Sequence, residues 1–248
     1  MVMRILRLTC AMMAMLAVAA AWGGPSSRVS PKDGTGGVSG DAVVKVEGSG
    51  APEKDASRVV VWLVPLEAVQ PVRMTTLRSR YRLVQRNKRF EPGLLVVPVG
   101  SVVDFPNADP WFHNVFSLYR GKRFDLGLYQ AGAQRSVRFD RMGPSYLFCN
   151  IHPEMTGVVL AIDSELFAVT DKSGHYAIAG VTPGKYVQHV WYENATPESL
   201  QAVQRQVTIE DANQIMPPIS VKAVKPAPVE HKNKYGQDYD PDRLKTAY

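Results

Sequence analysis

Metal-binding side chains of three kinds stand close together near the middle of the chain. Cys149, His152 and Met155 form the pattern C-x-x-H-x-x-M, and His113 lies upstream between two apolar segments. Thiolate and thioether sulfurs favour Cu(I), whereas imidazole nitrogens suit Cu(II), so such a set can hold copper in both oxidation states. Three of these side chains fit on one tight loop after a strand, and the fourth must come from elsewhere in the fold. The spacing therefore predicts one mononuclear copper site.

Other metal sites fit these residues less well. A structural zinc site favours four firm ligands, usually several of them cysteines, and Met155 would be a poor fourth. A binuclear copper centre needs a second cysteine in the loop, and copper enzymes of the oxidase or nitrite reductase type need histidines for further copper ions. Outside the segment that carries the cluster, the remaining histidines of the chain are His175, His189 and His231. We therefore expect no enzymatic activity.

The segment that must position these ligands, residues 81–163, is a series of short apolar runs broken by Gly, Pro and Asn. Almost no helical periodicity is present, and the runs have the length and composition of strands. They cover residues 94–97, 102–105, 136–139, 146–149 and 158–162. This pattern predicts an all-β fold whose first domain is an antiparallel β-sandwich.

Within this segment the motifs resemble one family of proteins. The loop C-x-x-H-x-x-M is similar to the short ligand loop of amicyanin. The run Phe112-His113-Asn114-Val115, which follows Asp104-Phe105-Pro106-Asn107, resembles the first-histidine region of plastocyanin. The resemblance implies a cupredoxin Greek-key sandwich that binds one type 1 (blue) copper ion.

By this resemblance His113, Cys149 and His152 are the in-plane ligands and Met155 is the axial ligand. The alternative for Met155 is a core residue beneath the loop. The resemblance also implies that Asn114 braces the loop by hydrogen bonding. It further implies that His152 reaches the surface through an apolar patch, for which the loop supplies residues 151 and 153 and the upstream segment residues 111 and 112.

A second module is predicted over residues 164–224. The turn Thr170-Asp171-Lys172-Ser173-Gly174 and the corner Pro183-Gly184-Lys185-Tyr186 resemble the carboxypeptidase regulatory-like β-sandwich. Residues 41–80 contain two further strand patterns, at 42–46 and 59–64. These strands either complete the second sandwich or extend the copper domain. The combination of modules resembles bacterial methylamine-utilisation-type proteins, a likeness that assigns no role in amine metabolism.

The two ends of the chain have different compositions. Residues 1–21 have a basic start, an apolar middle and small residues at the end, as in a secretory signal peptide, although a membrane anchor is the alternative reading. Residues 22–40, rich in Gly, Ser and Pro, predict a flexible linker, and residues 225–248 predict a tail that is disordered or loosely docked. Cleavage after the leader would remove Cys10, leave Cys149 as the single cysteine and leave no membrane span. We therefore expect a periplasmic or secreted protein.

Charge narrows the choice of partner only slightly. The net charge is +6, and residues 73–89 carry a run of Arg and Lys without an acid. That run would dock an acidic partner or form a solvated strand face. No nucleic-acid-binding motif is present.

The function that these observations favour is the carriage of single electrons between redox partners, such as a dehydrogenase or a cytochrome. Periplasmic copper storage or delivery would use the same ligands and is the main alternative. A third possibility is an adhesion module with a vestigial site.

Overall fold

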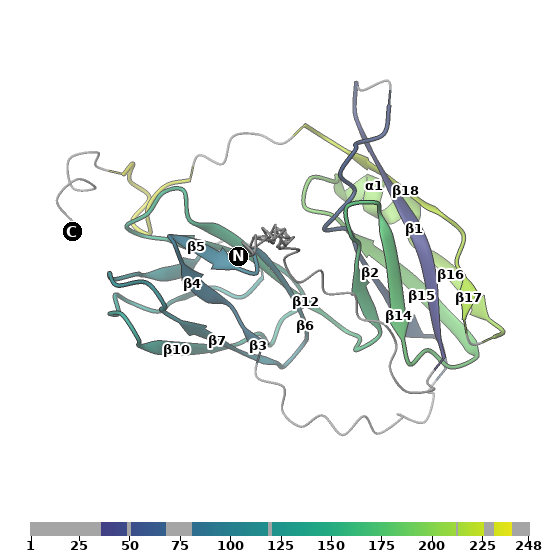
Figure 1. The fold of residues 1–248 in the computed structure, drawn as a ribbon, viewed down its shortest axis with the longest axis horizontal. Helices are drawn as coiled ribbons and strands as arrows, with labels where there is room; N and C mark the ends of the chain where they lie inside the picture. The colour runs from purple at the N-terminus through teal and green to yellow at the C-terminus, as the bar shows by residue number, and fades with distance from the viewer. Residues whose placement is uncertain are drawn as a thin grey trace, which may run out of the picture.

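The computed structural model describes residues 36–48, 51–67, 81–118, 121–211, 213–225 and 231–239. The predicted signal peptide lies outside these residues. The regular elements of the described part are strands, apart from one short helix, α1 (Pro197–Val203), so the all-β prediction is confirmed (Figure 1). No helix in these ranges is long and apolar enough to cross a membrane.

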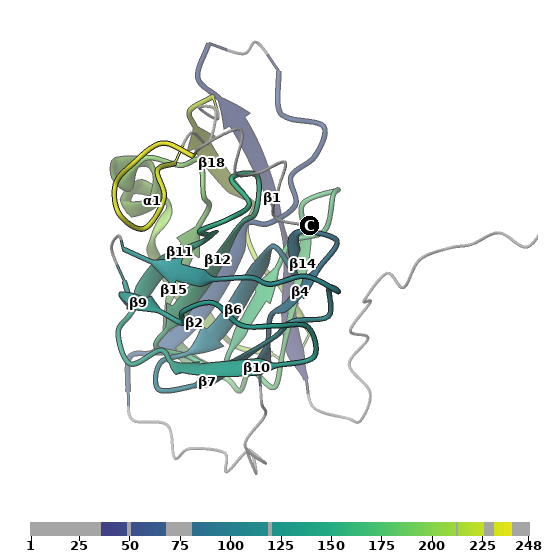
Figure 2. The same ribbon diagram turned by 90° about the vertical axis from the view of Figure 1, so that its left-hand side faces the viewer.

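Residues 81–162 form the first sandwich. One sheet has the order β6 (Leu94–Pro98), β12 (Thr156–Ile162), β11 (Gly143–Cys149), β8 (Val115–Ser117) and β9 (Phe124–Asp125). The other has the order β10 (Gln134–Arg138), β7 (Val102–Pro106) and β3 (Tyr81–Arg82), beside the hairpin of β4 (Val84–Arg86) and β5 (Arg89–Glu91). Figure 2 looks onto this sandwich and shows β7 and β10 in a separate layer from β11 and β12.

Side chains from both sheets fill the space between these layers. Along β12, Val159 and Ala161 point into this core, together with Val103 and Phe105 from β7 and Leu147 from β11. The alternation on β12 follows from the two-residue period of a strand. The same core contains the side chains of Cys149 and Met155, so the predicted ligand loop is anchored in the buried interior.

The second sandwich combines strands from both sides of the first in sequence. One sheet joins β1 (Gly37–Val46) to β14 (His175–Ala179), β17 (Gln214–Ile215) and β18 (Ile219–Ala223). The other has the order β13 (Phe167–Val169), β2 (Val60–Pro65), β15 (Gly184–Trp191) and β16 (Arg205–Ile209). Because β1 and β2 pair only with these later strands, the first sandwich is inserted between β2 and β13.

A third apolar cluster joins the two sandwiches. Val60 and Trp62 project from one face of β2, while the intervening Val61 and Leu63 project into the second core. The first pair packs with Trp191 of β15 and with Val96, Val158, Leu160 and Ile162 of β6 and β12. Trp62 also donates its indole hydrogen to Asp163 Oδ1 at 3.0 Å. The sandwiches therefore share a buried interface, with β2 next to β6 and β12 (Figure 1).

Two of the segment boundaries expected from the sequence differ in the structure. Residues 37–40 of the expected linker belong to β1, where they pair with residues 176–179 of β14, and the rest of the linker up to residue 35 lies outside the described residues. Residues 231–239 of the expected tail take the docked alternative, because hydrogen bonds join them to the first sandwich. Composition predicted disorder there because the contacts come from a few polar side chains rather than from an apolar face.

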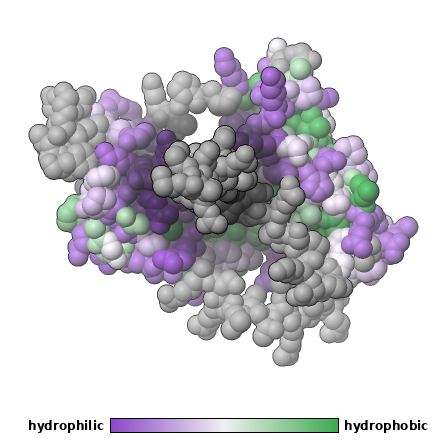
Figure 3. Space-filling view, in the orientation of Figure 1, coloured by the Kyte–Doolittle hydropathy of each residue, from purple (hydrophilic) through white to green (hydrophobic). Residues whose placement is uncertain are grey.

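Basic side chains of the arginine-rich run lie on the surface. Arg82, Arg86 and Arg89, on β3, β4 and β5, are exposed, and Arg86 lies 3.4 Å from Glu91. Hydrophilic residues cover most of the coloured part of this sandwich on the face shown in Figure 3. Arg73, Arg78 and Arg80 of the run lie outside the described residues, and the exposure of the other three suits both expected roles, a solvated strand face and a docking surface.

Candidate metal centre

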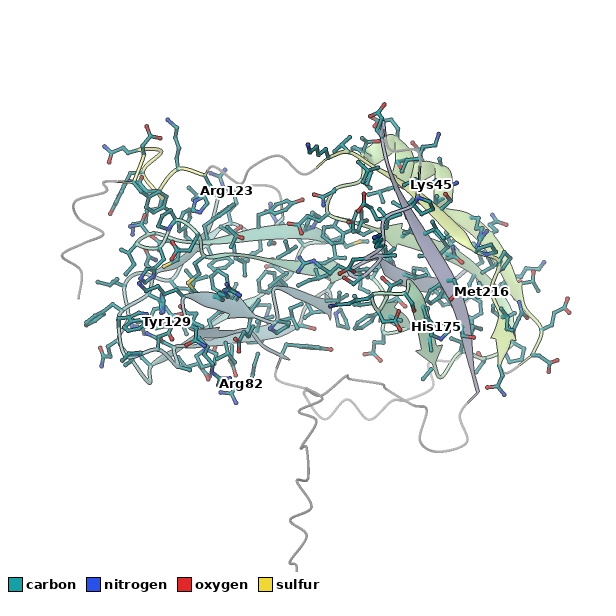
Figure 4. All side chains as sticks on the ribbon, turned by 45° about the horizontal axis from the view of Figure 1, so that its top comes forward. Lys45, Arg82, Arg123, Tyr129, His175 and Met216 are labelled. Carbon is teal, nitrogen blue, oxygen red and sulfur yellow. The ribbon has the colours of Figure 1, made fainter. Side chains whose placement is uncertain are left out.

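The predicted ligands come together at one end of the first sandwich. Cys149 is the last residue of β11, and the next strand, β12, begins at Thr156, so the loop between them carries His152 and Met155. His113 immediately precedes Asn114 and β8, whose first residue, Val115, pairs with Cys149. His113 also exchanges backbone hydrogen bonds with Tyr129, which Figure 4 places at the end farther from the second sandwich.

Three ligand atoms form a small triangle. Cys149 Sγ lies 3.6 Å from His113 Nδ1 and 3.5 Å from His152 Nδ1, and the two Nδ1 atoms are 3.1 Å apart. The point equidistant from these atoms lies about 2.0 Å from each. Bonds from a first-row metal such as zinc to imidazole nitrogen and thiolate sulfur measure about 2.0–2.3 Å. The donor set and its spacing therefore fit a metal ion. Within the described residues, His113, Cys149 and His152 form the group of potential ligands that lie close enough together to hold one metal ion.

The orientation of His113 is set by a buried carboxylate. Asp109 lies four residues upstream, and its Oδ2 is 2.9 Å from His113 Nε2. With the proton on Nε2, this nitrogen donates to Asp109, and Nδ1 is left with its lone pair toward Cys149 and His152. Asp109 also accepts hydrogen bonds from the backbone amides of Asn87 and Lys88, at 2.6 and 3.0 Å.

The carboxylate stays ionised despite its burial. Burial by itself raises the pKa of Asp109, but the hydrogen bonds from the Lys88 amide, His113 and the Asn87 amide outweigh it and lower that pKa below its ordinary value. Asp109 is therefore a fixed negative charge behind one ligand of the site. Its effect is to raise the electron-donating capacity of the His113 imidazole.

Burial keeps both imidazoles neutral. It lowers the pKa of His113. Burial also lowers the pKa of His152, to about 4, and the neighbouring His113 and Lys88 add to this effect. At neutral pH both rings therefore offer lone pairs rather than N–H groups to a metal. Burial also raises the pKa of the Cys149 thiol, against backbone hydrogen bonds that lower it. A metal ion that binds here must displace the thiol proton.

The loop between the ligands is held by its own backbone. The Met155 amide donates to the His152 carbonyl at 3.0 Å, and the Cys149 amide donates to the Met155 carbonyl at 3.2 Å. Met155 is fully buried in the core of the sandwich. These bonds place Met155 at the base of the same loop, and its role as the axial ligand stays a prediction.

Asn114 lies between the two halves of the site. Its carbonyl accepts a hydrogen bond from the Asn150 amide at 3.0 Å, and its side-chain amide donates to Asp125 Oδ1 at 2.6 Å. The first bond joins the segment that carries His113 to the ligand loop. The backbone of Asn114 therefore contacts the ligand loop, whereas its side chain contacts Asp125, and bracing of the loop by that side chain stays a prediction.

The surface over the site differs from the expected one. His152 is only 2% exposed, and Ile151, Pro153 and Trp111 are half-buried. Of the expected patch, Phe112 is exposed, at 50%, and Leu128, which the sequence did not indicate, is exposed at 58%. The two residues adjoin in sequence the members of the His113–Tyr129 backbone pair.

Sequence reasoning missed several residues around the site. Asp109 had one weak signal, its four-residue spacing from His113, which is not specific because such pairs are common. His231, Lys234 and Tyr239 contact the ligand loop from the C-terminal segment, and no pattern in the sequence indicated that contact.

The remaining histidines are used elsewhere. His175 lies 3.0 Å from Asp41 on the surface of the second sandwich. His189 stacks on Trp62, with ring centroids 5.0 Å apart and planes 14° from parallel. Neither belongs to the ligand cluster.

No family model and no curated protein matches this chain. Solved structures share a limited likeness with it. The purple cupredoxin of Nitrosopumilus maritimus is 24% identical, with a TM-score of 0.31, over 33% of this chain and 99% of that one. A mutant of amicyanin in the Cu(I) form is 21% identical, with a TM-score of 0.32, over 34% of this chain and 82% of that one.

A copper-containing nitrite reductase of Thermus scotoductus is 22% identical, with a TM-score of 0.33. The likeness covers 34% of this chain but only 23% of the reductase.

Proposed function

We propose that this chain is an exported type 1 copper protein that carries single electrons between redox partners. The observation that carries the proposal is the buried triangle of one cysteine sulfur and two histidine nitrogens, whose centre lies at metal-bonding distance from all three. A bound copper ion would supply the one-electron chemistry by cycling between Cu(I) and Cu(II). His113, Cys149 and His152 would hold it, with Met155 as a weak axial ligand.

The protein's own residues favour small rearrangement during that cycle. Cys149 and Met155 are fully buried and belong to one packed core, and His113 is fixed by Asp109 and by its backbone pair with Tyr129. A site whose ligands keep their positions in both oxidation states costs little reorganisation energy, which is what an electron carrier needs. The buried environment also keeps bulk water from the ligands.

A redox protein would dock over the exposed side chains of Phe112 and Leu128, which adjoin in sequence the His113–Tyr129 backbone pair. Apolar surface suits a short-lived complex because it is easily desolvated and makes few directional bonds. We identify the partner only by class, as a dehydrogenase or a cytochrome. Export would place both in the periplasm or outside the cell.

Copper storage or delivery would use the same ligands, and His231 would be the candidate relay histidine. However, Nε2 of His231 donates to the Pro153 carbonyl at 2.7 Å, and Nδ1 lies 3.2 Å from the hydroxyl of Tyr239. A ring held at both nitrogens is poorly placed to pass a metal ion. This contact favours the carrier.

Repeated redox cycling separates the two functions. The copper-loaded protein is reduced and reoxidised through many cycles with a small-molecule mediator, and the bound copper is measured afterwards. We expect full retention of copper and a constant potential. Rapid transfer of copper to an apo acceptor protein, faster than electron exchange, would contradict the carrier and support delivery.

A further inference from the structure

The segment 231–239, called here the strap, lies across the outer side of the ligand loop. The imidazole of His231 packs against Phe148, with ring centroids 4.2 Å apart and planes tilted by 38°, and donates to the carbonyl of Pro153. The hydroxyl of Tyr239 donates to the carbonyl of Cys149 at 2.8 Å. The backbone amide of Lys234 donates to Asn150 Oδ1 at 2.9 Å.

These contacts reach both ends of the loop that carries three of the ligands. A hydrogen bond to the Cys149 carbonyl fixes the peptide plane that follows the cysteine. The bond to the carbonyl of Pro153 fixes the peptide plane between Pro153 and Glu154. The first plane adjoins Cys149, and the second begins one residue beyond His152, so the strap restrains the backbone on both sides of the imidazole.

An ion pair also ties the strap to the other side of the site. Lys234 Nζ lies 2.8 Å from Asp125 Oδ2, and the other oxygen of this carboxylate accepts from the side chain of Asn114. The hydrogen bond to Asp125 raises the pKa of Lys234. Hydrogen bonds from Lys234 and Asn114 outweigh burial and lower the pKa of Asp125. Both groups are therefore charged at neutral pH.

The strap is itself ordered by a tight turn. The Asn233 side chain accepts hydrogen bonds from the amides of Tyr235 and Gln237, at 2.9 and 3.1 Å, and the Asn233 amide donates to the Gln237 carbonyl at 2.8 Å. The turn brings His231 and Tyr239 beside each other, with ring centroids 5.3 Å apart. The two side chains therefore reach the loop as a unit.

We propose that the strap completes the metal centre, with His231 and Tyr239 as positioning residues that hold the ligand loop in its binding geometry. This inference rests on the proposed function, because the loop is the one that would hold copper. It adds a second support to the backbone bonds within the loop. Without it, the loop would open more often, and copper would leave faster.

Hydrogen exchange on the metal-free protein tests the strap without relying on copper. The amides of Asn150 and Met155, which are bonded within the site, report opening of the loop. Tyr239→Phe removes the donor to Cys149, and His231→Phe keeps an aromatic ring against Phe148 but removes the bond to Pro153. We expect each variant to raise exchange at both amides about fivefold, the effect of losing one net hydrogen bond.

Gln237→Ala is the matched control, because it shortens an exposed side chain of the same strap and keeps the backbone bonds of its turn. The amide of Leu63, bonded to the Leu166 carbonyl in the second sandwich, reports global unfolding and should not change in any variant. In the copper-loaded protein, Tyr239→Phe should also raise the rate of copper loss to a chelator about fivefold.

The outcomes are distinguishable. Unchanged exchange at the amides of Asn150 and Met155 in both strap variants would overturn the positioning role of the strap, even if the protein binds copper as proposed. Faster exchange at these amides in the variants of a protein that fails to bind copper would support the positioning role of the strap and overturn the proposed function. A faster exchange at Leu63 as well would show that the variants weaken the whole fold, and would contradict a positioning role.

Discussion

The carboxylate of Asp109 and the Nε2 atom of His113 lie 2.9 Å apart in the buried interior, four residues apart in sequence. The opposite nitrogen of the same ring points at Cys149 and His152. The negative charge therefore acts through the ring on whatever ion the site holds. A carboxylate in this position stabilises the more positive of two oxidation states.

Asp109→Asn should accordingly raise the reduction potential of the bound copper, because Cu(II) loses more stabilisation than Cu(I). Loss of such an outer partner typically weakens metal affinity by roughly 10–100-fold. Protein-film voltammetry and a competition titration measure the two effects. Asp140→Asn, which changes an exposed carboxylate that contacts Lys122, is the control and should change neither. An unshifted potential in Asp109→Asn would show that the carboxylate has no influence on the metal.

The buried imidazole of His152 predicts how stability depends on pH. Burial lowers its pKa to about 4 in the folded, metal-free protein, against about 6.5 in the unfolded chain. The unfolded state therefore binds the proton more readily, and the free energy of unfolding falls as the pH drops from about 6.5 toward 4. The shift corresponds to about 3 kcal/mol at the acid end of this range.

Urea unfolding of the metal-free protein at pH 7 and pH 4.5 measures this dependence. His152→Ala serves as the comparison, because it removes the titrating group while carboxylates such as Asp109 remain. We expect the loss of stability between the two pH values to be smaller in the variant than in the original protein. Equal losses in both would mean that His152 is not buried as described.

Met155 has two chemically reasonable roles, axial ligand or core residue, because its side chain is a fully buried thioether. If it is a weak axial ligand, Met155→Leu should keep copper and the blue colour and raise the potential, since the more highly charged Cu(II) loses an electron donor. This volume-conserving substitution should cost under about 1.5 kcal/mol of stability. An unchanged potential would remove Met155 from the ligand set and leave three ligands.

The interface between the sandwiches should contribute to the stability of both. Leu160 of β12 is 2% exposed and belongs to the cluster that joins the two modules. Leu160→Ala should lower the free energy of unfolding by about 2–5 kcal/mol, measured by urea denaturation. Ile215→Ala, at a side chain that is 78% exposed, should change it by less than about 0.5 kcal/mol. A Leu160→Ala variant that is as stable as the Ile215→Ala control would mean that this interface contributes nothing to the free energy of unfolding.

The strands could be predicted from the sequence because their apolar runs are short, β-branched and bounded by turn residues. The run Val158 to Ile162 is an example, and β12 extends it by only two residues. The interface could not be predicted from the same run. Val159 and Ala161 face one core and Val158, Leu160 and Ile162 face the other module, but an uninterrupted apolar run gives no sign of which neighbour covers each face.

The site was predictable to the extent that its chemistry is local. Cys149, His152 and Met155 share one loop, so their spacing carries information, and His113 has a characteristic neighbourhood. Asp109 and the strap act through single hydrogen bonds between distant segments. Such bonds depend on the tertiary fold, and a polar segment with few apolar residues reads as disordered however well its side chains are placed.

The absorption spectrum of the copper-loaded protein tests the central proposal most directly. One Cu(II) ion bound by Cys149, His113 and His152 should give an intense blue colour from thiolate-to-copper charge transfer, in a ratio of one copper per chain. Cys149→Ser should abolish the colour, and the bound copper should be reducible and reoxidisable. A colourless Cu(II) complex of the original protein, or a blue complex that survives Cys149→Ser, would contradict a type 1 copper site at these residues.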